Sequence, residues 1–213
     1  MSSSTAYPLS GPIESLGLAT SFARDAEIYE ENHPAEFFYK VVDGTVRTYK
    51  ALSDGRRQIG AFYMAGDFFG LEDEVRAFSA EAVTDAHLVA IRRSTLVALA
   101  AEENDVARQL WVLTSRELER TRSHIMLMVE SAEQRLAAFL VEMADRLDGD
   151  DIELPMGRRD IADYLGLTIE TVSRTFTHLE KMALIALPTS RRVVLCNRRA
   201  LQQLAAAAEF ASQ

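Results

Sequence analysis

The chain has 213 residues, of which 48% are hydrophobic and 26% are charged, enough to build two modest domains with cores of their own. Its net charge is -9, but residues from 152 onward carry 8 Lys and Arg against 6 Asp and Glu, a net +2, which leaves -11 on the first 151 residues. No segment approaches the roughly 20 apolar residues that cross a bilayer, and the amino terminus lacks the basic and apolar regions of a signal peptide. We therefore expect a cytoplasmic protein that does not engage a membrane.

Residues that could support catalysis or bind a metal are few and scattered. The chain has one cysteine, Cys196, and four histidines at positions 33, 87, 124 and 178, whose spacing gathers no set of metal ligands. An iron-sulfur cluster needs several cysteine thiolates, so the sequence excludes one. With no nucleophile and base to pair and no glycine-rich phosphate loop, an enzyme is a distant alternative. We expect no metal and no cofactor.

The amino-terminal part predicts a short arm followed by a β-rich domain. Residues 1–20 contain several Ser, Pro and Gly residues and are expected to form a flexible arm. From 21 to 103, short apolar runs alternate with turn signals, which predicts many short strands and a sensor-like β roll. The clearest strands are expected at 37–42, 45–52 and 58–63, separated by turns at 43–44, 53–55 and 65–67.

A long helix is predicted over residues 104–130, because Pro and Gly are absent from Val106 to Val129. Seam residues recur in it with a period of seven, which favours a coiled-coil homodimer. The alternative is a stripe that packs only on the chain's own β roll, as Leu110 and Leu113 must. Threonines and a methionine in the seam indicate a monomer-dimer equilibrium. The predicted dimer interface comprises Trp111, Thr114, Leu118, Thr121, Ile125, Met128 and Ala132.

The last predicted domain, residues 131–213, begins with a helical run at 133–140 that is broken at 148–151. Two short helices follow: the first runs from Arg159 to Leu165, and Gly166 supplies the turn between them. Thr168 is placed to cap the second helix, which starts near Ile169. The inward face of this second helix comprises Val172, Phe176 and Leu179, and its exposed face comprises Glu170, Ser173, Arg174 and Thr177.

The exposed face of the second helix has the chemistry of base recognition in the major groove of DNA. Arg174 can donate two parallel hydrogen bonds to guanine, Glu170 can accept from the cytosine amino group, and Ser173 is small and adaptable. These three are the predicted base-reading residues, and together they favour a G·C pair. The alternative is that Glu170 and Arg174 form only an i, i+4 ion pair on a solvated helix. The acidic amino-terminal part and the mildly basic carboxyl-terminal part together weaken non-specific DNA binding, so selection of the DNA site depends more on base contacts.

The segment after the second helix predicts a β hairpin, the wing of a winged helix, with strands at 184–187 and 192–196 around a turn at 188–191. Arg191 and Arg192 are candidates for DNA phosphate contacts, or else they keep an edge strand soluble. Cys196 lies near the end of the hairpin, where oxidation would add bulk or charge close to DNA. The alternative for Cys196 is a buried structural thiol.

The pattern Glu170-x-x-Ser173-Arg174 resembles the recognition helix of the CRP/FNR regulators, above all their FNR and FixK branches. Turn positions 43–44 and 66–70 match the β-roll framework of the same family, so the resemblance extends over nearly the whole chain. It implies an α+β fold with an N-terminal cupin-like double-stranded β roll, a long dimerisation helix and a C-terminal winged helix-turn-helix. Two recognition helices related by a two-fold axis then read a palindromic DNA site.

The resemblance also implies a particular operator. Family members similar to CRP itself usually carry an arginine before the glutamate, where this chain has Ile169. FNR-like specificity, with a TTGA-N6-TCAA-like site, is therefore expected. The resemblance places Arg158, Thr168 and Thr171 at positions that touch DNA phosphates, which suits a guanidinium group and the start of a helix.

The same comparison of motifs argues against a cyclic nucleotide. Nucleotide-binding relatives have Gly-Glu-Leu where this chain has Gly70-Leu71-Glu72, and Arg-Ser or Arg-Thr where it has Arg76-Ala77. A cyclic phosphate would therefore lack a hydroxyl partner. FixK-type regulators, which lack the iron-sulfur cluster, control microaerobic and nitrogen-fixation genes. The alternative within the family is a regulator gated by haem or by another small molecule.

A contact with RNA polymerase is implied by the resemblance alone. Family analogy assigns such a surface to the acidic loop of Glu72, Asp73 and Glu74, although acidic loops are usually just solvated. A regulator that touches polymerase through this loop would act mainly as an activator.

Overall fold

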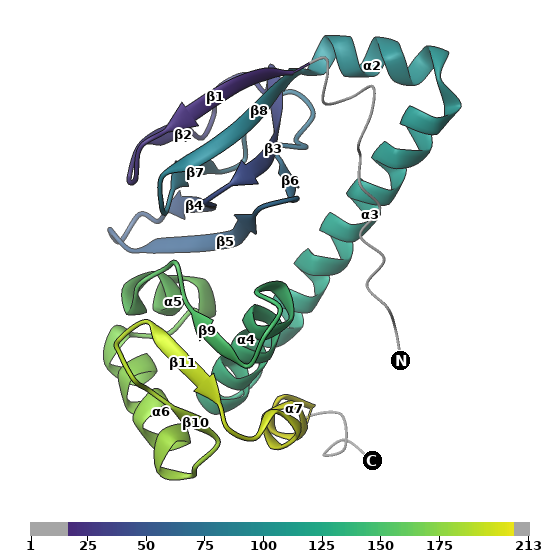
Figure 1. The fold of residues 1–213 in the computed structure, drawn as a ribbon. Helices are drawn as coiled ribbons and strands as arrows, with labels where there is room; N and C mark the ends of the chain where they lie inside the picture. The colour runs from purple at the N-terminus through teal and green to yellow at the C-terminus, as the bar shows by residue number, and fades with distance from the viewer. Residues whose placement is uncertain (1–16, 207–213) are drawn as a thin grey trace. The chain divides into compact units, whose positions relative to one another are not determined.

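The computed structural model describes residues 17–206, which divide into two compact units. The first comprises residues up to Ala51 together with Ile59–Glu119, and the second comprises Leu52–Gln58 together with residues from Arg120 onward. The first unit is rich in strands, whereas helices and a small sheet make up the second (Figure 1). The predicted α+β class, with a β roll, a long helix and a winged helix-turn-helix in that order, is confirmed.

Two four-stranded sheets form the β roll. Strand β1 already begins at Leu18 and pairs antiparallel with β8 from Leu18 to Phe22, so residues 18–20 belong to the sheet and not to the predicted arm. Residues 1–16 of that arm lie outside the described residues. One sheet has the order β1 (Leu18–Phe22), β8 (Ala86–Arg92), β3 (Phe37–Asp43) and β6 (Phe68–Phe69), and the other has the order β2 (Glu27–Tyr29), β7 (Ser79–Ala82), β4 (Thr45–Ala51) and β5 (Arg57–Met64).

Glycines stand at the predicted turns of the roll because the backbone there has a positive φ. Gly44, between β3 and β4, has φ +86°, and a Cβ at this position would lie 2.2 Å from the carbonyl oxygen of Asp85. Gly66, in the predicted turn after β5, has φ +92°. Both conformations are costly for residues that carry a Cβ, so the turn predictions are confirmed by the backbone geometry.

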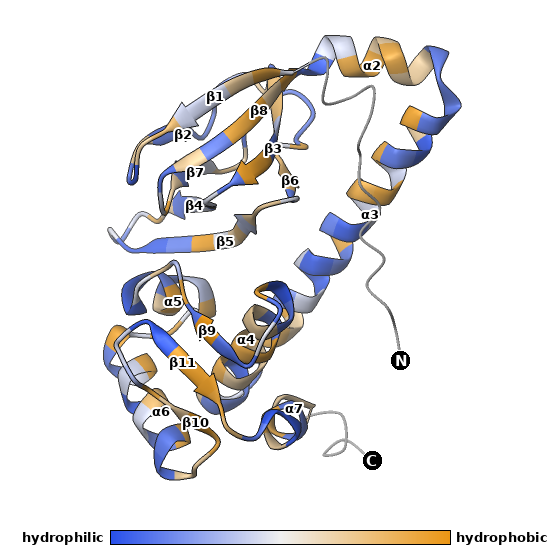
Figure 2. Ribbon diagram, viewed as in Figure 1, coloured by the Kyte–Doolittle hydropathy of each residue, from blue (hydrophilic) through white to orange (hydrophobic). Residues whose placement is uncertain are grey.

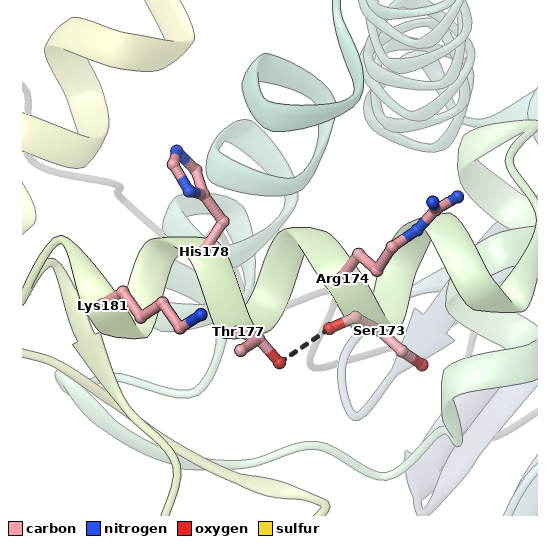
Figure 3. A pocket seen from close by; sticks show the side chains of 5 residues that line it. All are labelled: Ser173, Arg174, Thr177, His178 and Lys181. Atoms are coloured by element: carbon pink, nitrogen blue, oxygen red, sulfur yellow. Dashed lines mark hydrogen bonds between the residues drawn. The ribbon is translucent and has the colours of Figure 1, made fainter.

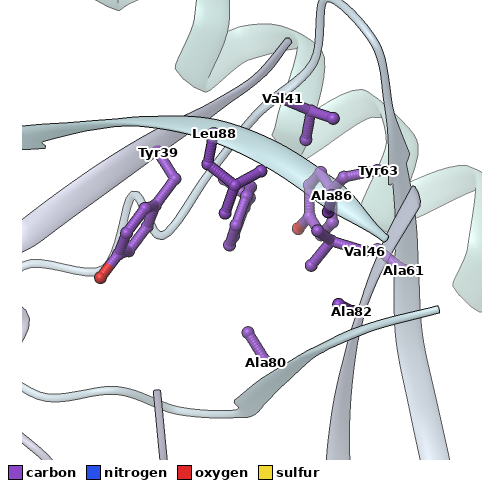
Figure 4. Packing of buried hydrophobic residues seen from close by; sticks show 10 residues of the cluster. Tyr39, Val41, Val46, Ala61, Tyr63, Ala80, Ala82, Ala86 and Leu88 are labelled. Atoms are coloured by element: carbon purple, nitrogen blue, oxygen red, sulfur yellow. The ribbon is translucent and has the colours of Figure 1, made fainter. Parts of the chain in front are cut away.

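Aromatic side chains fill the interior between the sheets (Figure 4). The ring centroid of Phe69 lies 5.1 Å from those of Tyr39 and Tyr63 and 6.1 Å from that of Tyr29. Such stacked and tilted pairs add specific attraction to the burial of large apolar areas. Small residues at Ala80 and Ala82, both fully buried, leave room for the rings on the facing strands.

Two helices follow the roll, α2 (Arg93–Glu102) and α3 (Asn104–Leu127). Helix α3 was predicted from the sequence, whereas α2 was not. Leu110 and Leu113 of α3 are partly buried against a cluster of roll residues that includes Phe38 and Ile91, so the expectation that these two leucines pack on the roll is confirmed.

The predicted dimer seam lies on a neighbouring face of α3, and the large apolar seam residues within this helix are exposed. Trp111 is 75% exposed, Leu118 49% and Ile125 60%, and hydrophobic residues alternate with charged ones along the helix (Figure 2). The seam is shorter than predicted, because α3 ends at Leu127 and Ser131 starts a new helix with a capping box. The last two predicted seam positions, Met128 and Ala132, therefore lie beyond α3.

The second unit contains a helical core with a three-stranded sheet of order β10-β11-β9. Strand β9 and the last helix, α7, were not predicted. The elements that follow α3 are α4 (Ala132–Arg146), β9 (Asp151–Glu153), α5 (Arg158–Leu165), α6 (Ile169–Lys181), β10 (Ile185–Ala186), β11 (Arg192–Leu195) and α7 (Arg198–Ala206). Among the described residues, no helix is both long and apolar enough to span a bilayer.

Arg135 of α4 joins the linker between α3 and α4 to the end of α5. Its guanidinium group donates to the carbonyl oxygens of Glu130 at 2.8 Å, Leu165 at 2.8 Å and Met128 at 2.5 Å. Carbonyl groups at the end of a helix carry partial negative charge and lack intrahelical partners. A single cation therefore fixes the end of α5, and with it the start of the turn that leads into α6.

Candidate DNA-binding surface

Helices α5 and α6 form a helix-turn-helix whose turn is fixed by local hydrogen bonds. Gly166 ends α5 in the left-handed conformation, with φ +62°, and its N–H donates to the carbonyl oxygen of Ala162. Thr168 then begins α6, and its Oγ1 accepts from the N–H of Thr171 at 3.2 Å. The glycine turn and the threonine cap are thus confirmed, and together they set the direction in which α6 leaves the turn.

The inward face of α6 is buried as predicted. Val172, Phe176 and Leu179 are at most 1% exposed. Thr175 is also buried, and its hydroxyl group donates to the carbonyl oxygen of Thr171 at 2.9 Å, which satisfies a polar group that would otherwise be costly to bury. This packing holds α6 in one orientation and leaves its other face to solvent.

The three predicted base-reading residues lie on that exposed face. The side chain of Arg174 has no hydrogen bond or ion pair within residues 17–206, so its five N–H donors are free. Hydrogen bonds from the backbone of Glu170 and from Thr168 hold the pKa of Glu170 below its ordinary value, and Arg174 makes a smaller contribution. Glu170 is therefore an ionised acceptor, and the surface ion pair considered as an alternative is not formed.

Toward the end of α6 the exposed face forms a shallow concave surface, which encloses a volume of about 420 Å³. Ser173, Arg174, Thr177, His178 and Lys181 line it (Figure 3). His178 Nε2 lies 3.4 Å from a carboxylate oxygen of Glu133 in α4, while Lys181 is exposed. His178 and Lys181 were not among the predicted site residues. The spacing of seven residues from Arg174 to Lys181, which places both on one helical face, is the signal that could have identified Lys181.

The predicted phosphate-contacting residues divide into two groups. Thr168 and Thr171 stand at the start of α6, and their hydroxyl oxygens are 3.1 Å apart. The side chain of Arg158, by contrast, folds inward: its guanidinium carbon lies 3.1 Å from the ring centroid of Phe176, and its Nη1 is buried with no partner among the described residues. Burial lowers the pKa of Arg158 to about 10, which still leaves it charged at neutral pH. Arg158 therefore braces α5 against α6, and this inward orientation does not favour its predicted phosphate contact.

The wing arginines are also engaged within the domain. Arg191 donates to the carbonyl oxygen of Pro155 at 3.0 Å. Arg192 makes two hydrogen bonds to Asp151 of β9, at 2.7 and 2.9 Å, and these bonds lower the pKa of Asp151 and raise that of Arg192. Arg192 remains about half exposed, so it can approach DNA. Its charge would then be shared between the phosphate and Asp151.

Cys196 follows β11 at the base of the hairpin and not at its tip, since Leu195 pairs with Ile185. The thiol is exposed, so the alternative of a buried structural cysteine is wrong. Within the described part of the chain, no three His, Cys, Asp or Glu side chains come together in a way that could hold a metal ion.

The β roll has a buried arginine at the position examined for nucleotide binding. Arg76 is 2% exposed and donates to the carbonyl oxygens of Gly70 and Phe37 and to the Glu72 carboxylate. Its guanidinium carbon lies 4.0 Å from the ring centroid of Tyr29. The charge of Arg76 is therefore balanced by Glu72 inside the protein, its guanidinium group stacks on Tyr29, and its Nη atoms are directed at internal acceptors.

The residues of the acidic loop at 72–74 differ in their exposure to solvent. Glu72 is held by Arg76 at 3.0 Å and is mostly buried. The side chain of Asp73 is 96% exposed, at 3.7 Å from Arg93, and Glu74 is exposed as well. Of the three acidic residues predicted to touch a partner, only Asp73 and Glu74 present their side chains to solvent.

In comparisons with known proteins, two domain models match separate parts of the chain. The Crp-like helix-turn-helix domain model matches residues 134–204, and the cyclic nucleotide-binding domain model matches residues 19–103. The nitrogen fixation regulation protein FixK of Azorhizobium caulinodans is 46% identical over 200 residues, covering 90% of this chain and 81% of the relative. FixK of Rhizobium meliloti is 38% identical over 200 residues, covering 92% and 90%.

Among solved structures, FixK2 from Bradyrhizobium japonicum matches with a TM-score of 0.85 and 46% identity, covering 88% of this chain and 96% of that one. A CRP-family regulator from Thermus thermophilus, TTHB099, matches with a TM-score of 0.72 and 26% identity, covering 88% and 96%. The chain belongs to the CRP/FNR family of transcription regulators, and it is not an enzyme. Within that family it is a regulator of the FixK type with a helix-turn-helix DNA-binding domain.

Proposed function

We propose that this FixK-type regulator acts as a homodimer, mainly as an activator, on a palindromic TTGA-N6-TCAA-like operator. Its proposed setting is the cytoplasm, in microaerobic or nitrogen-fixation gene control, since relatives of high identity carry the name nitrogen fixation regulation protein. The proposal includes DNA binding without a cyclic nucleotide, an iron-sulfur cluster or another cofactor. Its partners are double-stranded DNA, RNA polymerase and a second copy of the chain.

The observation that carries the proposal is the unpaired guanidinium group of Arg174 beside the ionised carboxylate of Glu170 on an exposed helix face. A guanidinium group can donate to both O6 and N7 of guanine, and a carboxylate can accept from the amino group of the paired cytosine. Because the two residues are four apart, they lie about 6 Å apart along the helix axis. This spacing suits contacts to the same or adjacent base pairs, as a G·C pair within TTGA requires.

Phosphate binding is assigned to the start of α6, where Thr168 and Thr171 lie beside the helix amides, and to Lys181 at its other end. Cationic and amide donors at both ends of a recognition helix fix its register on the DNA without reading sequence. The wing arginines contribute less, because Pro155 and Asp151 already accept their hydrogen bonds.

Independence from a nucleotide is supported by the contacts of Arg76. An incoming cyclic phosphate would have to replace the Glu72 carboxylate and two backbone carbonyl groups, and it would leave those buried acceptors without a donor. The stacked rings of Tyr29, Tyr39 and Phe69 already fill the neighbouring interior. The chain's single cysteine argues against an iron-sulfur cluster.

A polymerase contact is proposed for Asp73 and Glu74 only, since Glu72 is held by Arg76. The test is in-vitro transcription from a promoter that carries the operator. Substituting Asp73 and Glu74 by Ala should reduce the transcript while operator affinity stays unchanged. Equal transcription from wild type and variant would refute this contact.

The operator itself is tested by selecting bound sequences from a random DNA pool with the purified, ligand-free protein. The proposal expects a palindrome with TTGA half-sites separated by six base pairs. Arg174→Ala in the same selection should lose its preference at the guanine. A pool that remains random would refute the proposal, and a visible absorption spectrum of the same sample would then show whether haem had been overlooked.

A further inference from the structure

Thr177 occupies the middle of the concave surface on α6, between Lys181 and Ser173 (Figure 3). Its side chain is exposed, yet its hydroxyl group is already engaged, because Oγ1 donates to the carbonyl oxygen of Ser173 at 3.1 Å. A threonine on a helix commonly satisfies its hydroxyl group in this way. The hydroxyl group therefore has no hydrogen left to donate to a ligand, although its oxygen can still accept, and the methyl group of Thr177 remains free to make apolar contact.

The residues around Thr177 differ from it in length and polarity. Arg174, His178 and Lys181 are long and polar and stand around the surface, whereas Thr177 and Ser173 are short. A small apolar spot framed by hydrogen-bond donors fits a base edge that is itself apolar at one point. In the major groove, that description applies to the C5-methyl group of thymine.

Position along the helix indicates where this thymine lies. Thr177 is three residues beyond Arg174 and four beyond Ser173, which corresponds to about 4.5 and 6 Å along the axis. One base step is about 3.4 Å. The base that meets Thr177 is therefore one or two steps from the base pair read by Arg174.

We propose that Thr177 is a specificity-determining residue whose methyl group contacts the C5-methyl group of a thymine one or two steps from the guanine read by Arg174. This inference rests on the proposed function, because it requires sequence-specific DNA binding through α6. It adds to that function a fourth base-reading side chain, which acts through apolar contact where Glu170 and Arg174 act through hydrogen bonds.

The experiment removes one of the two contacting methyl groups at a time, either from the DNA or from the protein. The operator is first defined by selection, and each of its thymines is then replaced by uracil, which lacks only the C5-methyl group. Thr177→Ser removes the methyl group of the protein and keeps the hydroxyl group and its bond to Ser173. Thr177→Val keeps the methyl group and replaces the hydroxyl group by a second methyl group, so it is the matched control for the loss of the hydroxyl group.

The proposal expects wild type to lose about fourfold in affinity when uracil replaces the contacted thymine in one half-site, and about fifteenfold when it does so in both. Thr177→Ser should bind the thymine operator about as weakly as wild type binds the uracil operator, and it should show no further loss with uracil. Thr177→Val should respond to uracil as wild type does.

Two results would overturn the inference while leaving the proposed function intact. One is a selective operator at which no uracil substitution weakens wild-type binding. The other is a Thr177→Ser variant that loses as much affinity with uracil as wild type does. Failure of the selection to yield any operator would instead refute the proposed function, and the assignment of Thr177 with it.

Discussion

Replacing Ile125 with alanine is expected to weaken dimerisation of the protein. Ile125 is 60% exposed in the protomer, in the predicted seam of α3. Fully burying an isoleucine side chain stabilises by about 1.5 to 3 kcal/mol, so burying the exposed part at an interface contributes about 1 to 2 kcal/mol. A symmetric dimer buries two copies, which makes the expected loss about 2 to 4 kcal/mol, or roughly 30- to 700-fold in the dimer dissociation constant.

Sedimentation equilibrium over a range of protein concentrations measures this constant directly. Met126→Ala is the control, because Met126 is 64% exposed and lies at the same end of α3 but about 100° around the helix from Ile125. Operator binding by Ile125→Ala should recover at high protein concentration, since the DNA-reading surface is unaltered. Equal dimer dissociation constants for wild type and Ile125→Ala, or a larger effect of Met126→Ala, would refute the reasoning that this seam forms the dimer.

Four further outcomes are expected. Arg174→Ala should cost about 1 to 3 kcal/mol of operator binding and abolish discrimination at the guanine, which titrations on matched and guanine-substituted duplexes measure; unaltered discrimination would contradict its assignment. Thr168→Ala should lower the free energy of unfolding by about 0.5 to 2 kcal/mol through loss of the helix cap, and an unchanged denaturation curve would argue against that cap. Burial, and to a smaller extent the charge of the nearby Arg120, lowers the pKa of His124. As the pH falls through about 6.5, this histidine becomes protonated in the unfolded chain but stays neutral in the folded chain, which destabilises the folded state. The melting temperature of wild type should therefore fall more between pH 7.5 and pH 5.5 than that of His124→Phe, and equal decreases would exclude this linkage. Peroxide should weaken operator binding by wild type more than by Cys196→Ser, whereas equal loss in both proteins would eliminate the thiol as the cause.

The helix-turn-helix could be predicted closely because its determinants are local. Gly166 adopts the left-handed conformation, Thr168 supplies the cap, and Val172 and Phe176 repeat at the helical period. Each of these signals acts within one or two turns of helix, so a single sequence contains it. The turn at Gly44 is predictable for the same reason.

What the sequence could not provide are pairings between distant segments. Strand β9 is three residues long and exists through its pairing with β11, whose Arg192 is 41 residues from Asp151. The inward orientation of Arg158 depends on the ring of Phe176, and no local pattern indicates that contact. For this reason the sequence predicts phosphate contacts for Arg158, Arg191 and Arg192, whereas in the structure each of them contacts a partner within its own domain.

The limits of the long seam have a similar origin. A heptad period can be continued on paper through Met128 to Ala132, but Ser131 and Gln134 form a capping box that starts a separate helix. Periodicity reports which residues would share a face of an unbroken helix, while the caps decide where the helix ends. The capping-box pattern is itself visible in the sequence and would have placed this boundary.

The most direct test of the central claim is the fluorescence anisotropy of the purified, ligand-free protein at fixed physiological salt. It compares a TTGA-N6-TCAA duplex with a duplex in which the G·C pairs of both half-sites are changed. Tight binding to the first and much weaker binding to the second is the result expected of an effector-independent regulator that reads DNA through Glu170, Ser173 and Arg174. Weak binding that does not distinguish the two duplexes would contradict the account.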